Sequence, residues 1–398
     1  MDKKTLIIFR WAPPAPGGPQ NLYNLFAPIE DGSYVILTNY SNIYRKGQPL
    51  GKSLPCKYYY YDKFWPENLR PSASGFILGR LALTWHRIKQ TFWMLRGGIR
   101  LIKREKIKLI FAVSDGGHSF LYAFTLSILT GTPYVVFLFD IFKENNLARN
   151  WKLFAKIFEP MLFRFAKLLI VTNQGTKDFY DKRGGHRLSI QVIYNSTFPE
   201  PYQKLHTPFN PQPPYKIFFT GNLYWAQETS VRNLIRAVRT INNMSLELHF
   251  YILNPPENFV EDFKDVKNLF IKTGSPQEMP EIQSQADILF LPLAWNTPSP
   301  DIINTATPGK LTDYLIAGRP ILIHAPRSAF LVHYARENGF AHIVDEENTE
   351  LLAQGIRTLL TDIPYSRTLV ENAEKTFFMN HHAQKNVELL VAILNQLE

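Results

Sequence analysis

The sequence predicts an α/β protein built of two facing Rossmann-like domains with a cleft between them. The chain has 398 residues, which is long enough for two hydrophobic cores. Short apolar runs typical of buried parallel strands alternate with helical segments in both halves. Six prolines between residues 199 and 214 indicate a stiff connection. We therefore place one domain at residues 1–200 and a second at 201–375, followed by a helical segment at 376–398.

Charge is distributed unevenly between the two halves. The whole chain has a net charge of +10, but residues 1–200 contain 28 lysines and arginines against 13 acidic residues, whereas residues 201–398 contain 16 against 21. A basic half is typical of proteins that meet nucleic acid, an anionic membrane or a phosphorylated substrate. The single cysteine, Cys56, excludes an internal disulfide and fits a reducing compartment. We therefore expect a cytoplasmic protein.

The first predicted strand, Thr5–Phe9, leads into a loop that contains glycine. The apolar part of this strand is too short for a signal peptide. Gly17 and Gly18 come just before a predicted helix through Asn21–Phe26. Glycines between a first strand and a first helix let a phosphate or sugar approach the backbone closely. The same pair equally fits a plain turn.

Two later strands of the first domain end in polar side chains. The strand Leu109–Val113 leads to His118 at a predicted helix start, and the strand Tyr134–Phe139 is followed by Asp140. Ligands of doubly wound sheets bind at such strand ends. A helix start disfavours the protonated form of His118, so we expect a neutral, hydrogen-bonding imidazole. Asp140 is a candidate substrate contact or base. A structural histidine and a solvated strand end are the alternatives.

Residues 80–108 form a basic segment with tryptophans and a helical apolar stripe. Its charged residues are nine bases and one acid: Arg80, Arg87, Lys89, Arg96, Arg100, Lys103, Arg104, Lys106, Lys108 and Glu105. This pattern suits a helix that lies on anionic lipid. A solvated charged face with the stripe in the core is an equal alternative. Nucleic-acid binding ranks last, because the sequence has no recognisable nucleic-acid module.

The most informative stretch is residues 307–320. Thr307 suits a helix N-cap, and Pro308 suits the first helical position. Lys310 and Asp313 are three residues apart and share one helix face. One interpretation is an intrahelical ion pair, although a lysine in the first turn opposes the helix dipole. The other is a phosphate held by free amides and the ammonium group, with a ribose on the carboxylate.

The residues Pro-Gly-Lys-Leu-Thr-Asp-Tyr-Leu-Ile-Ala-Gly-Arg-Pro-Ile, at positions 308–321, resemble the donor-site helix of glycosyltransferase family 4. This family belongs to the group 1 glycosyl transferases, which have the GT-B fold. The resemblance implies that Lys310 contacts the diphosphate of a nucleotide sugar. It also implies that Asp313 replaces the family's ribose-binding glutamate. Thr305 stands where many members carry a second glutamate, so the sugar-contacting carboxylate is absent.

The resemblance covers nearly the whole chain and implies further site residues. The donor site would consist of Gly221, Asn222, Thr273, Gly274, Thr307, Gly309, Lys310 and Asp313. Gly17 and Gly18 would face the acceptor and the diphosphate, in an acceptor-side first domain. His118 and Asp140 would be catalytic together with Lys310. The segment 376–398 would cross back to the first domain, and we expect its His381 and His382 to be solvated.

These expectations describe a retaining hexosyltransferase that moves a sugar from a UDP- or GDP-sugar to a glycan or lipid-linked acceptor, in cell-surface polysaccharide synthesis. Retention is implied by the resemblance alone. The sequence has no Asp-x-Asp or His-Glu-x-x-His motif, so we expect neither a metal nor another cofactor. We expect no nucleic-acid partner, and we expect peripheral contact with the inner face of the plasma membrane through residues 80–108. The alternative is a non-catalytic nucleotide-sugar-binding or partner protein of the same fold.

Overall fold

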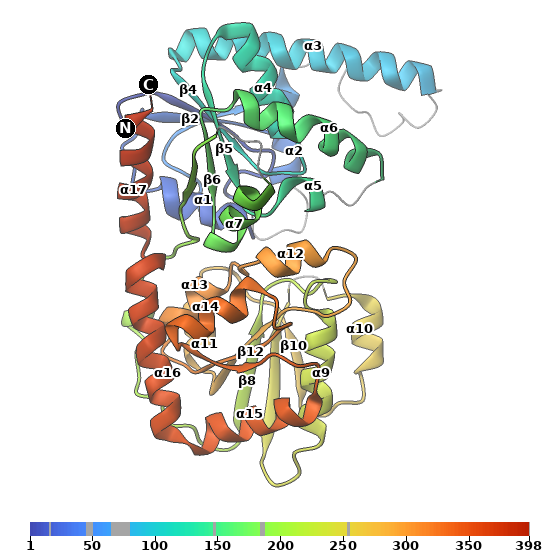
Figure 1. Cartoon of the computed structure of the whole chain (residues 1–398), viewed down its shortest axis with the longest axis vertical. Helices are drawn as coiled ribbons and strands as arrows, with labels where there is room; N and C mark the ends of the chain where they lie inside the picture. The colour runs from blue at the N-terminus through green and yellow to red at the C-terminus, as the bar shows by residue number, and fades with distance from the viewer. Residues whose placement is uncertain are drawn as a thin grey trace. The chain divides into compact units, whose positions relative to one another are not determined.

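The computed structural model describes residues 1–15, 17–44, 51–64, 80–145, 149–183, 188–252 and 255–397. The chain divides into two compact units (Figure 1). Unit 1 consists of Met1–Ile193 and Val387–Glu398, and unit 2 consists of Tyr194–Asn386. The chain thus passes from unit 1 to unit 2 just before the proline-rich connection, and the segment 376–398 is shared between the two.

Unit 1 contains a parallel sheet of seven strands in the order β3-β2-β1-β4-β5-β6-β7. The strands are β1 (Thr5–Ile8), β2 (Tyr34–Thr38), β3 (Lys57–Tyr60), β4 (Leu109–Val113), β5 (Tyr134–Leu138), β6 (Leu168–Val171) and β7 (Ile190–Val192). Three of these confirm strands predicted from apolar runs: β1, β4 and β5. Their central residues are buried on both faces, which is why they lack a polar alternation.

The helices of unit 1 lie on both faces of this sheet (Figure 1). They are α1 (Pro19–Phe26), α2 (Tyr40–Ile43), α3 (Arg80–Glu105), α4 (His118–Thr130), α5 (Phe142–Asn145), α6 (Arg149–Phe165), α7 (Gln174–Arg183) and the C-terminal α17 (Ala383–Gln396). A 3₁₀ turn, η1 (Tyr61–Lys63), follows β3. Leu390 and Leu394 of α17 share a buried cluster with Phe26 of α1 and Phe111 of β4. The C-terminal helix is therefore part of the core of unit 1.

Unit 2 contains a second parallel sheet, of six strands in the order β10-β9-β8-β11-β12-β13. The strands are β8 (Tyr215–Thr220), β9 (Leu246–Tyr251), β10 (Leu269–Lys272), β11 (Ile288–Pro292), β12 (Ile321–His324) and β13 (Ala341–Val344). The helices are α8 (Glu200–Gln203), α9 (Glu228–Arg239), α10 (Glu257–Asp262), α11 (Met279–Ser284), α12 (Pro300–Thr305), α13 (Leu311–Ile316), α14 (Phe330–Asn338), α15 (Thr349–Thr361) and α16 (Ile363–Thr376). Separate buried clusters lie on the two faces of the sheet.

The two sheets share one topology, which confirms the predicted fold class. In unit 1 the chain adds β2 and β3 on one side of β1 and then β4 to β7 on the other. In unit 2 it adds β9 and β10 on one side of β8 and then β11 to β13 on the other. The chain therefore changes direction between β1 and β4 and between β8 and β11. Doubly wound sheets bind ligands at such a switch point, beyond the carboxyl ends of the strands. The loops after β1, β4, β8 and β11 are therefore the places to look for a site.

Candidate functional site

At the switch point of unit 2, the turn after β8 lies against Lys310. Gly221 directly follows β8 and has φ 106, a left-handed conformation that favours glycine. A Cβ atom placed on Gly221 would lie 3.3 Å from Cε and 3.5 Å from Nζ of Lys310. The structure thus brings together two predicted donor-site residues that are far apart in the sequence. Asn222, the next residue, is exposed.

The ammonium group of Lys310 is buried and unpaired. Its Nζ makes no hydrogen bond within the part of the chain that the structure describes. It lies 3.7 Å from the centroid of the Phe219 ring, the last apolar position of β8. Burial lowers the pKa of Lys310 to about 7. Because the ammonium group has no partner, the intrahelical ion pair with Asp313 is wrong.

The turn before α13 differs from the predicted cap. Helix α13 begins at Leu311, so Lys310 rather than Thr307 occupies the N-cap position. The amide of Leu311 donates to the carbonyl of Pro308 at 2.9 Å, which closes a turn ahead of the helix. The prediction that Thr307 caps the helix is therefore wrong. Its hydroxyl oxygen is buried without a partner among the described residues, as is Nζ of Lys310.

Asp313 lies in the first turn of α13, in a ring of hydroxyl groups. Burial raises the pKa of its carboxyl group to about 6, while the hydroxyls of Tyr202, Thr197 and Thr312 act in the opposite direction. The Tyr202 hydroxyl also reaches Oε1 of Gln283 at 3.2 Å. The hydroxyl has one proton, so it donates to either Asp313 or Gln283 at any one time. Sequence reasoning missed Tyr202 and Gln283, which lie outside the motif.

A buried network fixes α13 against the end of β8. The amide of Thr220 donates to the Tyr314 hydroxyl at 3.0 Å, and Nε2 of Gln283 donates to Oγ1 of Thr220 at 3.2 Å. Tyr314 is fully buried. Strand β8, helix α11 and helix α13 therefore form one rigid support beneath Lys310 and Asp313.

Thr273 and Gly274 follow β10, which is two strands away from β8 in the same parallel sheet. Thr273 is exposed. A Cβ atom on Gly274 would come within 2.7 Å of Cε of Met279. These residues share the carboxyl edge of the sheet with Gly221. Gly309 is exposed in the turn before α13.

In unit 1, Gly17, Gly18 and His118 lie beyond β1 and β4, the switch-point strands. Gly17 has φ 83, whereas Gly18 is helical and is the N-cap of α1. A Cβ atom on either glycine would meet no atom within 4 Å. His118 opens α4, and desolvation lowers its pKa. Its imidazole thus tends to be neutral, although desolvation rather than the helix start is the main cause.

Asp115 is a further polar residue at this switch point that sequence reasoning did not select. Its carboxylate accepts hydrogen bonds from the amide of Arg10 at 3.0 Å and from the amide of Ser119 at 3.0 Å. It therefore ties the end of β1 to the first turn of α4. This is a structural role beside the candidate ligand-binding residues.

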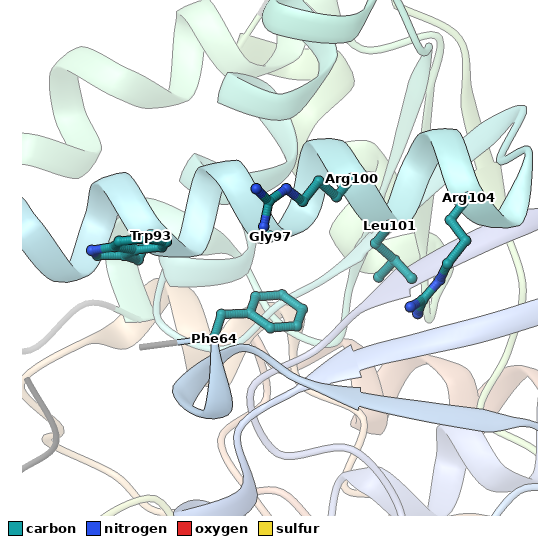
Figure 2. A pocket seen from close by; sticks show the side chains of 6 residues that line it. All are labelled: Phe64, Trp93, Gly97, Arg100, Leu101 and Arg104. Atoms are coloured by element: carbon teal, nitrogen blue, oxygen red, sulfur yellow. The ribbon is translucent and has the colours of Figure 1, made fainter. Parts of the chain in front are cut away.

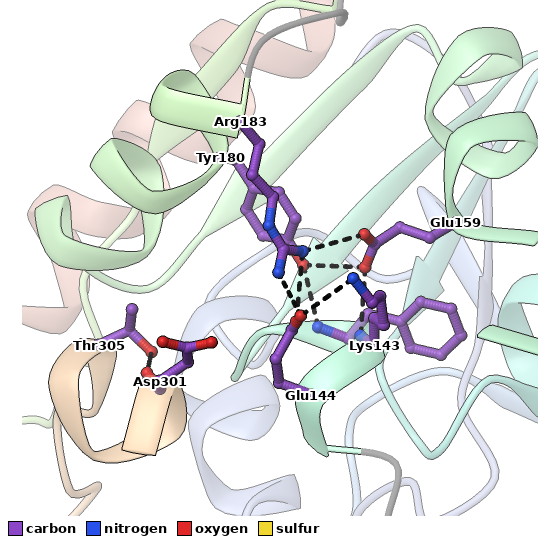
Figure 3. A network of polar contacts seen from close by, with 8 residues as sticks. Lys143, Glu144, Glu159, Tyr180, Arg183, Asp301 and Thr305 are labelled. Atoms are coloured by element: carbon purple, nitrogen blue, oxygen red, sulfur yellow. Dashed lines mark hydrogen bonds and ion pairs between the residues drawn. The ribbon is translucent and has the colours of Figure 1, made fainter. Parts of the chain in front are cut away.

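Asp140 follows β5, next to β4 in the sheet, and burial raises the pKa of its carboxyl group. The segment after Asp140 is held by a network of ion pairs and hydrogen bonds (Figure 3). Arg183 pairs with Glu144 and lies 3.4 Å from Oε1 of Glu159, and the amide of Lys143 donates to Oε2 of Glu159 at 3.1 Å. Burial raises the pKa of Glu159 to about 7. This network fixes α5 to α6 and α7.

The basic segment, residues 80–108, forms the long helix α3 and the turn that leads to β4. A cavity of about 250 Å³ lies against α3, shown in Figure 2. It is lined by Arg100 and Arg104, one helical turn apart, and by Trp93, Gly97, Leu101 and Phe64. Gly97 is required here, because a Cβ atom would lie 2.2 Å from the Phe64 ring.

The prediction that His381 is solvated is wrong. It is fully buried, and its ring nitrogens lie 3.0 Å from the Tyr334 hydroxyl and 2.7 Å from the carbonyl oxygen of Asn195.

Among the residues that the structure describes, no group of three histidine, cysteine or acidic side chains could hold a metal ion. Within the same residues, no helix is both long and apolar enough to span a membrane.

Two Rossmann-like units, each with a doubly wound parallel sheet, are the architecture of the GT-B fold. The chain has this fold. Residues 214–362 match the family model described as Glycosyl transferases group 1. The matched range contains Gly221, Lys310 and Asp313. The predicted resemblance to the group 1 glycosyl transferases is therefore confirmed.

Solved structures with the same fold include Anabaena HepE in complex with UDP-glucose, with 14% identity and a TM-score of 0.70 over 99% of this chain and 100% of that chain. Sucrose-phosphate synthase from Thermosynechococcus elongatus has 13% identity and a TM-score of 0.70, over 99% of each chain. WaaG, a glycosyltransferase involved in lipopolysaccharide biosynthesis, has 13% identity and a TM-score of 0.63, over 97% of this chain and 99% of that chain. None of the curated protein sequences compared with the chain matches it.

Proposed function

We propose that the protein is a glycosyltransferase that binds a nucleotide diphosphate sugar in unit 2 and transfers the sugar to an acceptor. The donor diphosphate would lie against Lys310 and Gly221, and the ribose hydroxyls would donate to Asp313. The family match over residues 214–362 supports this assignment. So does the fold shared with HepE, which was solved with UDP-glucose. UDP-sugars are accordingly the first donors to test, with GDP-sugars second.

The observation that carries the proposal is the buried, unpaired ammonium group of Lys310. A desolvated cation without a counter-ion costs free energy, and proteins retain such groups where a ligand supplies the opposite charge. A diphosphate does so, and its negative charge grows as the bond to the sugar breaks. Helix α13 has only six residues, so its dipole contributes little and Lys310 carries most of the stabilisation.

Further groups around Lys310 could contact such a ligand. Gly309 is exposed in the turn before Lys310, and the buried hydroxyl of Thr307, which has no partner among the described residues, is available to a phosphate oxygen. We assign the nucleobase to the turn at Thr273 and Gly274, and an outer donor contact to Asn222. On the acceptor side we assign Gly17, Gly18, His118 and Asp140 of unit 1, with His118 and Asp140 as candidate catalytic groups.

The finer parts of the proposal are inferred from family resemblance. They are transfer with retention, a hexose as the transferred sugar, a reaction without metal or other cofactor, and a glycan or lipid-linked acceptor in cell-surface polysaccharide synthesis. Asp140 is the candidate base for the acceptor hydroxyl, because burial raises its pKa and a more basic carboxylate accepts a proton more readily.

One observation favours a second candidate, a nucleotide-sugar-binding protein that does not catalyse transfer. Thr305 occupies the position of the family's second glutamate, and its hydroxyl donates to the carbonyl of Asp301 at 2.9 Å (Figure 3). This hydroxyl is engaged within α12 and is not directed at a sugar. The donor sugar therefore lacks one carboxylate contact that would favour the transition state.

Two assays on the full chain separate these candidates. The first is a thermal-shift screen with UDP, GDP and their glucose, galactose and mannose derivatives. We expect one diphosphate nucleotide to stabilise the protein, and no response at millimolar concentration would contradict both candidates. The second measures release of the nucleoside diphosphate with extracted lipid-linked and free glycan acceptors. Release that depends on an acceptor supports the transferase, whereas binding without release supports the second candidate.

A further inference from the structure

Helices α3, α4 and α6 form one packed layer of unit 1. Helix α4 contacts both of the others (Figure 1). Gly98 of α3 faces the Tyr122 hydroxyl of α4. The centroid of the Phe124 ring of α4 lies 5.6 Å from that of Phe158 and 5.8 Å from that of Phe165 on α6. Since α4 and α6 both pack on the sheet, their exposed sides point away from it.

Helix α6 has a buried apolar stripe and a second apolar stripe that is exposed. Ala155, Phe158 and Leu162 are buried in unit 1. A second, exposed stripe is spaced by four residues: Leu153, Ile157, Met161 and Phe165, with exposed fractions of 64%, 64%, 43% and 58%. A surface helix of a soluble domain normally presents polar residues there. Contiguous exposed apolar side chains of this kind mark an interaction surface.

The neighbouring helices extend this stripe. On α4 the exposed large apolar side chains are Leu121, Ile128 and Leu129, and on α3 they are Trp85, Ile88 and Phe92. The last three lie at helical spacing, as do those on α6. We call the exposed apolar and basic side chains of α3, α4 and α6 the α3–α4–α6 face.

The charge of this face has one sign. The three helices contain eleven lysines and arginines and two acids, Glu105 and Glu159. Both acids are already paired, Glu105 with Lys4 at 2.8 Å and Glu159 with Arg183 at 3.4 Å. Exposed Lys152, Lys156 and Arg164 flank the stripe on α6. The partner of this face must therefore be apolar and anionic.

We propose that the α3–α4–α6 face docks on the surface of an anionic lipid bilayer, with the α6 stripe inserted between the headgroups. Apolar side chains interleaved with lysine and arginine suit the boundary between headgroups and acyl chains, where the cations meet lipid phosphate. Arg100, which lines the pocket against α3, adds a further guanidinium group on this helix. A second copy of the chain fits poorly, since a symmetric contact would oppose two surfaces of the same charge.

The proposal extends the predicted membrane contact beyond residues 80–108, and it does not depend on catalysis. The test is co-sedimentation of the full chain with vesicles of phosphatidylcholine alone and of phosphatidylcholine mixed with an equal amount of phosphatidylglycerol. We expect binding to the mixed vesicles only. The variant Leu153→Ser/Ile157→Ser should bind at least about tenfold more weakly. The variant Lys152→Gln/Lys156→Gln/Arg164→Gln should bind at least about tenfold more weakly too.

The matched control is Leu351→Ser/Met379→Ser, which removes two exposed apolar side chains from unit 2. We expect this control to bind vesicles as the parent does. All variants change exposed positions, and their melting temperatures, measured alongside, show that they remain folded. Absence of binding to the mixed vesicles would overturn the proposal. So would equal binding by the α6 variants, or a self-association in ultracentrifugation that the Leu153→Ser/Ile157→Ser change abolishes while vesicle binding persists.

Discussion

The ammonium group of Lys310 lies 3.7 Å from the centre of the Phe219 ring and has no hydrogen-bond partner in the described part of the chain. An aromatic face attracts a cation, but it replaces only part of the hydration that burial removes. The pKa of about 7 expresses this deficit. On the proposed function, an anion that binds beside Lys310 would remove this deficit.

The first prediction concerns stability without ligand. Lys310→Met keeps the length of the side chain and removes the charge, so we expect it to stabilise the free protein at pH 7 by about 1–3 kcal/mol. The unfolded chain keeps the lysine proton up to its ordinary pKa of 10.5, whereas the folded chain releases it near 7. The unfolded state therefore binds more protons in this range, so parent stability rises with pH from 7 to 10.5.

Urea unfolding of the parent and of Lys310→Met across this pH range measures the effect. We expect the difference between the two proteins to shrink as the pH rises. Lys264→Met, at an exposed lysine of unit 2, is the control and should leave stability nearly unchanged. A loss of stability in Lys310→Met at pH 7 would show that the ammonium group is satisfied in the free protein.

The second prediction concerns the pH dependence of donor binding. Above about pH 7 the free protein loses the Lys310 charge, and below about pH 6 it loses the Asp313 charge. We expect affinity for the nucleoside diphosphate to be highest between these values and to fall by up to about tenfold per pH unit on the alkaline side. Binding at pH 8 should take up a proton, because the diphosphate restores the Lys310 charge.

Titration calorimetry in buffers of different ionisation enthalpy measures this proton uptake. Lys310→Met should show no uptake and a flat alkaline limb. If the affinity of parent and variant falls equally steeply above about pH 7, a group other than Lys310 causes the fall.

The third prediction concerns Gly221. Gly221→Ala places a methyl group 3.3 Å from Cε of Lys310, at a residue with φ 106. We expect a stability loss of about 1–2 kcal/mol from backbone strain, and donor affinity roughly tenfold lower because Lys310 is displaced. Gly32→Ala is the matched control, because Gly32 has φ 88 and open space around it. It should lose similar stability and keep its donor affinity. A loss of affinity in both variants would show that the effect does not depend on the contact with Lys310.

The fourth prediction concerns Tyr202. Its hydroxyl opposes the upward shift of the Asp313 pKa, so Tyr202→Phe should raise that pKa further above about 6. The acidic limb of donor binding should then move to higher pH, with about 1 kcal/mol lost in stability. Tyr365→Phe, which removes a hydroxyl 3.1 Å from Nδ1 of His342, is the control. An unchanged acidic limb in Tyr202→Phe would mean that Asp313 does not control it.

The strands were predictable because burial on both faces leaves short, nearly continuous apolar runs, such as Leu109–Val113 and Tyr134–Leu138. Strand β13, Ala341–Val344, was missed because it is an edge strand of four residues with His342 inside it. The cap at Thr307 was wrong because local preference does not show that a turn closes at Leu311 before the helix begins.

The site was predictable only where its residues are neighbours in sequence. The motif indicated Lys310 and Asp313, but the contacts that give them their properties come from distant positions. Phe219 lies beneath Lys310, and Tyr202 and Gln283 support the helix that carries Asp313. These contacts depend on how β8, α8, α11 and α13 pack together, which no local pattern contains. The exposed stripe on α6 was missed because its spacing is the same as that of a buried helix face.

A structure of the full chain with the bound nucleoside diphosphate that emerges from the thermal-shift screen tests the central claim most directly. We expect a diphosphate oxygen within about 3 Å of Nζ of Lys310 and a ribose hydroxyl within about 3 Å of the Asp313 carboxylate. A nucleotide bound elsewhere, with the Lys310 ammonium group still unpaired beside Phe219, would contradict the claim.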